Sequence, residues 1–141
     1  MTDIMLSNEN MQYINMAGKI TKTDILDCMI ADDKLIFIVK KGQLGAAIGN
    51  KAKNLEKLRN LFKKTIKFVE EESDKKHFIR NLCKPYEIDE IQLAGSEEEP
   101  VAIISVSASD KSKLIGKNGR NIEMIRDLAK RHHNFKDVQI K

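Results

Sequence analysis

Two glycines enclose a lysine and an asparagine in the segment 115–126, whose sequence is IGKNGRNIEMIR. Apolar residues recur at helical spacing from Ile122 onward, so a helix is predicted to begin after the second glycine. The first N–H groups of a helix lack partners within it and carry partial positive charge, which attracts anions. Glycine allows a close approach and a positive φ. With Lys113, Lys117 and Arg120 beside it, this turn predicts a phosphate-binding site.

The same pattern occurs 67 residues earlier, in the segment 48–59, whose sequence is IGNKAKNLEKLR. An isoleucine, a glycine, an asparagine, a glutamate and an arginine coincide between the two copies. Each copy follows a β-rich run (35–39 and 101–106) and precedes a helical stripe and a short strand. We therefore expect two copies of one unit of about 70 residues, with the first at 1–71 and the second at 72–141.

Hydrophobic periodicity predicts the same order of elements in both copies. In the first copy we expect a helix at 8–18, strands at 25–31 and 35–39, a short helix at 43–48, a helix at 52–62 and a strand at 65–69. Leu55, Leu58, Leu61 and Phe62 form the apolar face of that last helix. In the second copy we expect a helix at 74–82, strands at 86–93 and 101–107, a short helix capped by Ser109 or Asp110, a helix at 120–132 and a strand at 138–140.

Charge is distributed in blocks, although the net charge of the 141 residues is only +4. Residues 34–67 hold ten basic side chains and one acidic side chain, and residues 111–141 hold nine and three. The segments 1–33 and 68–110 are acidic. A single charge run commonly marks a solvated surface, but two basic blocks that coincide with a repeat favour a polyanionic partner.

Other classes of function have little support. No apolar run approaches the length of about 20 residues that spans a bilayer, and the N-terminus does not resemble a secretory signal, so we expect a cytoplasmic protein without a membrane partner. Cys28 and Cys83 lack the spacing of zinc or redox sites, and the three histidines do not converge, so we expect no metal and no cofactor. The glycines miss the spacing of a nucleotide-binding P-loop, and no catalytic set is present, which argues against an enzyme.

A glycine turn placed between a short helix and an amphipathic helix, with strands on either side, is the setting of the KH module, whose GXXG loop clamps nucleic-acid backbone. Over nearly its whole length the chain resembles a tandem of type II KH modules, and most closely the short archaeal NusA-like transcription factors. The strongest segments are VKKGQLGAAIGNKAKNLEKL and LIGKNGRNIEMIRDLAKRHHNFKDVQI. The resemblance implies an α/β (α+β sandwich) fold, with a three-stranded sheet and helices on one face of each module.

The resemblance also implies where single-stranded RNA would lie. In the second module Gly116, Lys117, Asn118 and Gly119 would hold the backbone, with Arg120 and Lys113 beside them and Ile115 and Ile122 under the bases. In the first module the loop positions are Gly49, Asn50, Lys51 and Ala52, with Lys53 adjacent and Ile48 and Leu55 below. Core packing is an equally good interpretation of these four apolar residues.

Alanine 52 replaces the last glycine of the first turn, which adds a methyl group where the backbone approaches most closely. We expect Ala52 to have a helical φ and the first module to bind RNA more weakly, through its many lysines. The family also implies a role in transcription elongation or termination and contact with RNA polymerase. No segment of the 141 residues indicates the polymerase contact by itself, because the additional domains of bacterial NusA are not found in it.

Two alternatives remain open at this stage. The first is a KH-fold protein that mediates protein interactions in ribosome or ribonucleoprotein assembly and binds little RNA. The second is binding of single-stranded DNA, because a backbone clamp does not by itself recognise the 2′-hydroxyl group. With 5% aromatic residues, base recognition by stacking is not expected. We expect a monomer.

Overall fold

The computed structural model describes residues 7–31 and 33–141, in two compact units that divide between Glu72 and Ser73. The sequence places this boundary one residue earlier. Residues 1–6, which contributed to the argument against a secretory signal, lie outside the described residues. Within the described ranges, no helix is both long enough and apolar enough for a membrane crossing.

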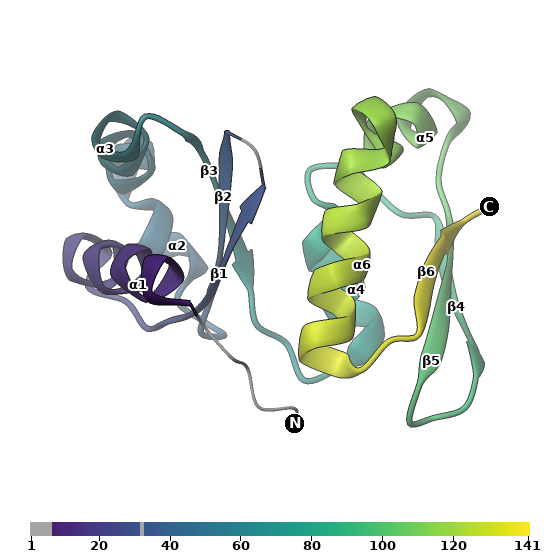
Figure 1. The fold of residues 1–141 in the computed structure, drawn as a ribbon. Coiled ribbons are helices and arrows are strands. Elements are labelled where there is room, and N and C mark those ends of the chain that lie inside the picture. The colour runs from purple at the N-terminus through teal and green to yellow at the C-terminus, as the bar shows by residue number, and fades with distance from the viewer. Residues whose placement is uncertain (1–6, 32) are drawn as a thin grey trace. The chain divides into compact units, whose positions relative to one another are not determined.

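The first unit contains three helices and a three-stranded sheet. Its elements are α1 (Asn8–Thr21), β1 (Ile25–Ala31), β2 (Lys34–Val39), α2 (Leu44–Ile48), the 3-10 turn η1 (Asn50–Ala52), α3 (Lys53–Phe62) and β3 (Thr65–Glu70). Strand β2 is central, antiparallel to β1 and parallel to β3. The helices lie on one face of this sheet (Figure 1).

The second unit repeats this order. It contains α4 (Lys75–Cys83), β4 (Glu90–Gly95), β5 (Pro100–Ser105), α5 (Ala108–Ile115), the 3-10 turn η2 (Lys117–Gly119), α6 (Arg120–His133) and β6 (Asp137–Ile140). Strand β5 is central, antiparallel to β4 and parallel to β6. The predicted fold class, an α+β sandwich with one three-stranded sheet per module, is confirmed.

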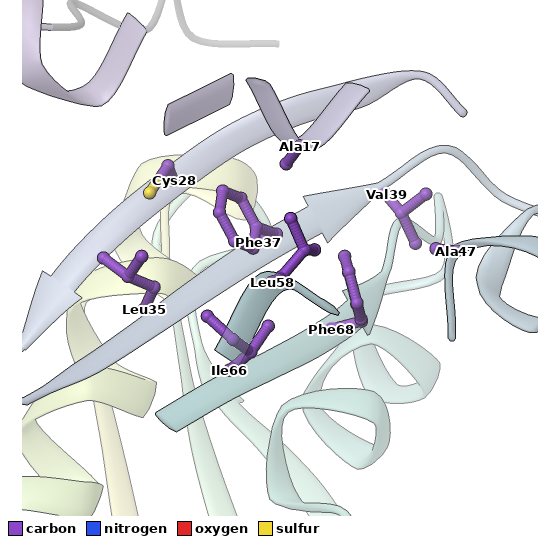
Figure 2. Close-up of a cluster of buried hydrophobic side chains, with 9 residues drawn as sticks. All are labelled: Ala17, Cys28, Leu35, Phe37, Val39, Ala47, Leu58, Ile66 and Phe68. Carbon is purple, nitrogen blue, oxygen red and sulfur yellow. The ribbon is translucent and has the colours of Figure 1, made fainter. Parts of the chain in front are cut away.

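Alternating residues of β2 build the core of the first unit. Leu35, Phe37 and Val39 are fully buried among residues from β3, α1, α2 and α3 (Figure 2). Leu58 of α3 is also fully buried, and the rings of Phe37 and Phe68 stack with their centroids 5.7 Å apart. This packing fixes α2 and α3, and therefore the turn between them, relative to the sheet.

Three predicted boundaries differ from the structure for local reasons. Helix α1 continues to Thr21, because the Lys22 N–H still donates to the Gly18 carbonyl (2.8 Å), and it ends at Lys22 in a left-handed conformation. Strand β4 begins at Glu90 rather than near residue 86, because the Tyr86 N–H donates to the Cys83 carbonyl (3.0 Å) in a turn. Helix α5 has Ser107 at its cap position, so the predicted cap at Ser109 or Asp110 is wrong and β5 ends at Ser105.

The apolar face predicted for α3 is wrong at one position. Leu58 is fully buried, whereas Leu61 is 49% exposed. Leu61 is three residues from Leu58 on a helix whose side chains advance by about 100° per residue, and here the core ends before it reaches Leu61.

These two leucines supply a matched pair for testing the core. We expect Leu58→Ala to lower the free energy of unfolding of the first unit by about 2–5 kcal/mol, because it leaves a cavity among closely packed side chains. We expect Leu61→Ala to change it by less than about 1 kcal/mol, since a largely exposed side chain loses little burial. Amide hydrogen exchange of strand β2 measures both effects. Equal losses in the two variants would contradict the placement of α3.

Candidate nucleic-acid interface

The turn between α5 and α6 has positive φ angles at three positions. Gly116 has φ 80° and ψ 172°, Asn118 has φ 56° and ψ 25°, and Gly119 has φ 74° and ψ 13°. Glycine adopts such angles without strain, and asparagine tolerates the left-handed region better than most residues. The residue types of the second turn therefore suit its backbone, as the sequence predicted for the glycines.

The turn between α2 and α3 has the same backbone with less suitable residues. Gly49 has φ 84° and ψ 166°, Lys51 has φ 54° and ψ 35°, and Ala52 has φ 57° and ψ 29°. The expectation that Ala52 has a helical φ is therefore wrong, because it occupies the left-handed position that Gly119 occupies in the second turn. Each non-glycine residue in this region costs about 1–2 kcal/mol. The first turn therefore has the same backbone conformation as the second, but Lys51 and Ala52 are strained in it.

Each turn is closed by its own backbone hydrogen bonds. The Gly119 N–H donates to the Gly116 carbonyl (3.1 Å), and the Arg120 N–H donates to the Lys117 carbonyl. The Ala52 N–H donates to the Gly49 carbonyl at the same distance of 3.1 Å. The sequence argument treated the first helical N–H groups as open, but the first one of each helix, that of Lys53 in α3 and of Arg120 in α6, already donates within the turn. The exposed middle residues of the second turn are Lys117 and Asn118.

Helices α3 and α6 begin without a side-chain cap, unlike α1 and α4. The Ser7 hydroxyl accepts from the Asn10 N–H (3.1 Å) at α1, and the Asp74 carboxylate accepts from the His77 N–H (2.9 Å) at α4. The residues at the same position of α3 and α6 are Ala52 and Gly119, which have no side-chain acceptor. The cap position supplies no negative side chain at these two helix starts, although the first turn of each helix holds a glutamate, Glu56 in α3 and Glu123 in α6.

A cation also occupies the first residue of each of these helices, Lys53 in α3 and Arg120 in α6. A positive charge opposes the helix dipole there and costs a few tenths of a kcal/mol or more. Lys113 in the last turn of α5 and Lys117 in η2 are exposed, as is Arg120. This concentration of positive charge suits a bound anion rather than helix stability.

The basic block of the first module is smaller than the sequence suggests. Lys41 pairs with the buried carboxylate of Glu72 at 3.0 Å, and Lys64 and Lys67 are partly buried. The exposed lysines of this block are Lys40, Lys41, Lys51, Lys53, Lys57 and Lys63. Lys51, Lys53 and Lys57 belong to the turn and to the first part of α3, so charge is concentrated at the candidate site.

The apolar residues beside the turns belong partly to the core. Ile48 and Leu55 are half-buried against the core cluster of the first unit, and Ile115 is half-buried. Ile122 is only 5% exposed, which leaves little of its side chain for contact with a base. Of these four, Ile122 fits core packing best, and the other three keep exposed surface beside the turns.

Sequence reasoning gave no role to the asparagine that occurs in both copies. In the structure, the side-chain amide of Asn121 donates to the Leu114 carbonyl (2.7 Å), and that of Asn54 donates to the Ala46 carbonyl (3.1 Å). Each asparagine thus connects the start of one helix to the end of the previous helix, across the glycine turn. The sequence did hold a signal for this role, because the same position of the repeat is asparagine in both copies.

Two family models match the chain, the KH domain over residues 12–76 and the NusA-like second KH domain over residues 75–140. The probable transcription termination protein NusA of Methanocaldococcus jannaschii is 30% identical over 140 residues, which cover 99% of this chain and 76% of that protein. The chain belongs to the NusA-like KH family. The NusA-like model covers the module that has the complete GxxG turn.

Further NusA-like relatives match nearly end to end. The probable transcription termination protein NusA of Halobacterium salinarum is 30% identical over 137 residues, covering 97% of this chain and 98% of that protein. The protein of the same name from Thermoplasma acidophilum is 26% identical over 141 residues, covering 100% and 98%. The crystal structure of APE1850 is 29% identical with a TM-score of 0.79, covering 96% of this chain and 100% of that one. The resemblance to tandem KH modules is confirmed.

Gly116 and Gly119, in the turn between α5 and α6, should differ in how much stability is lost when each is replaced by alanine. Gly119→Ala should cost about 1 kcal/mol, because the left-handed backbone is its main penalty and the nearest atom to an added Cβ, Ile122 Cγ2, is 3.9 Å away. Gly116→Ala should cost on the order of 2 kcal/mol or more, because an added Cβ lies 2.8 Å from Asn121 Cβ and 2.9 Å from its backbone nitrogen. Thermal denaturation compares them, and equal losses would contradict this packing.

Proposed function

We propose that the chain binds single-stranded RNA through its two glycine turns and acts in transcription elongation or termination together with RNA polymerase. One observation carries the RNA-binding part of this proposal. Two helices, α3 and α6, begin at turns of the same unusual backbone, without a side-chain cap and with a cation at the first position. KH modules bind the backbone of nucleic acids at such a turn.

The transcriptional part of the proposal rests on the family. The relatives from three archaea carry the name probable transcription termination protein NusA, and they match over almost all of this chain. Contact with RNA polymerase is proposed on the same basis. RNA binding is the part that residues of this chain can test directly.

The two modules are proposed to contribute unequally. The second turn combines glycines at both ends with Lys117, so it can hold a phosphate close to the backbone. The first turn has the same backbone shape, but the Ala52 methyl occupies the position of a glycine hydrogen. Its exposed lysines attract RNA over longer distances, and this attraction weakens as salt screens it.

The second-module clamp is tested by Lys117→Asp combined with Asn118→Asp. Both side chains are exposed, so the fold should persist, and two carboxylates in the turn should repel phosphate. We expect affinity for a single-stranded RNA, measured by fluorescence anisotropy at several salt concentrations, to fall about tenfold or more.

Two controls accompany this measurement. Circular dichroism establishes that the variant is folded, and a single-stranded DNA of the same sequence competes for the wild-type protein. Unchanged RNA affinity in the folded variant would exclude this turn as the clamp and favour a protein-interaction role. Equal competition by DNA would show that the clamp does not select RNA.

The first-module turn is tested by Ala52→Gly. This substitution removes a methyl group and relieves left-handed strain without changing charge, so we expect a few-fold tighter binding of RNA and an unchanged dependence on salt. The matched change, Gly119→Ala in the second module, should weaken binding. If Ala52→Gly leaves affinity unchanged, the first module contributes through its charge alone.

A further inference from the structure

Asn54 and Asn121 occupy equivalent places in the two modules, in the first turn of α3 and of α6. Each side-chain amide donates to a backbone carbonyl near the end of the previous helix, Ala46 for Asn54 and Leu114 for Asn121. The last carbonyls of a helix have no partner within that helix, so each asparagine satisfies a group that would otherwise depend on water.

The same asparagines lie against the first glycine of each turn. An ideal Cβ on Gly116 would lie 2.8 Å from Asn121 Cβ, and one on Gly49 would lie 3.0 Å from Asn54 Cγ and Nδ2. The distance at Gly116 is shorter than real Cβ contacts and the distance at Gly49 is tighter than most of them, so a side chain at either glycine would press on the asparagine. Both modules therefore combine an asparagine hydrogen bond with a glycine on which that asparagine packs.

We propose that Asn54 and Asn121 are positioning residues that hold the two turns in the conformation that binds phosphate. This inference rests on the proposed RNA binding and adds how the clamp is kept in shape. The side-chain bond joins the two helices that flank the turn, so Lys117 and Asn118 are presented from a closed corner rather than from a hinge between independent helices. A preorganised site loses less conformational entropy when its ligand binds.

The two modules differ in how well this bond is protected. The Asn121 bond is shorter, at 2.7 Å, and reaches the carbonyl of buried Leu114, two residues before Gly116. The Asn54 bond is 3.1 Å long and reaches the carbonyl of exposed Ala46, three residues before Gly49. Water competes more easily for an exposed hydrogen bond, so the bond of the second module should matter more.

Asn121→Ala tests the proposal, because it removes the amide and keeps the Cβ atom that packs on Gly116. We expect RNA affinity at 25 °C to fall about tenfold in the folded variant. Asn54→Ala should give a smaller loss. Asn60→Ala is the control, since Asn60 is an exposed asparagine of α3 away from the turn and its loss should leave affinity unchanged.

The salt dependence of RNA affinity distinguishes a residue that positions the turn from a residue whose charge contacts phosphate. Because Asn121 carries no charge, the slope of log affinity against log salt should remain that of the wild type. Lys117→Gln, which removes a phosphate contact, should reduce this slope by about 0.7.

Each remaining outcome has one meaning. If Asn121→Ala lowers the melting temperature but leaves the RNA affinity of the folded protein unchanged, the residue is merely structural and the proposal is overturned. If Asn121→Ala and Asn60→Ala weaken binding equally, the proposal is also overturned. If the wild-type protein itself binds no single-stranded RNA, the proposed function fails, and the positioning role fails with it.

Discussion

The corner between two helices, turned by successive residues with left-handed backbone, is the constraint on which the rest of the site depends. Such a corner brings the start of α6 next to the end of α5, and it requires residues that accept positive φ. It also brings Asn121 onto Gly116, where an added Cβ would lie 2.8 Å from Asn121 Cβ. The exposed Lys117 and Asn118 at the tip follow from this geometry.

The sheets and cores hold these corners in place. In the second unit, Arg126 of α6 donates to the Val138 carbonyl (3.0 Å) and pairs with Asp137 at 3.1 Å, which connects the helix to β6. In the first unit, fully buried Leu58 anchors α3 over the central strand. A helix start that carries a cation and has no side-chain cap is unfavourable in isolation, so the packing behind it must supply the stability.

Much of the architecture was predictable from the sequence, because hydrophobic periodicity and the internal repeat report directly on burial. Leu35, Phe37 and Val39 share one face of β2 within a continuous apolar run in which Ile36 and Ile38 are also buried, as expected of a strand covered on both faces, and the repeat of 48–59 at 115–126 indicated two copies of one fold. The boundary near residue 86 was missed and Leu61 was wrongly placed on the buried face of α3, since a local turn and the edge of the core depend on tertiary contacts. The left-handed φ of Ala52 was missed because alanine normally avoids it; only the matching position of Gly119 indicated it.

The two turns have the same backbone conformation and differ only in the residues that occupy it. Lys51 and Ala52 occupy left-handed positions that Asn118 and Gly119 occupy with less strain. Strained residues persist where the surrounding structure determines the backbone, and such sites are frequently functional. The first turn has kept its shape despite its residues, which agrees with a contribution from both turns.

Mapping of backbone amide chemical shifts during titration with a single-stranded RNA tests the central claim most directly. The account predicts the largest changes at residues 116–121, a second and smaller set at residues 49–54, and little change along the central strands β2 and β5. Saturable binding whose shifts avoid both turns would contradict it.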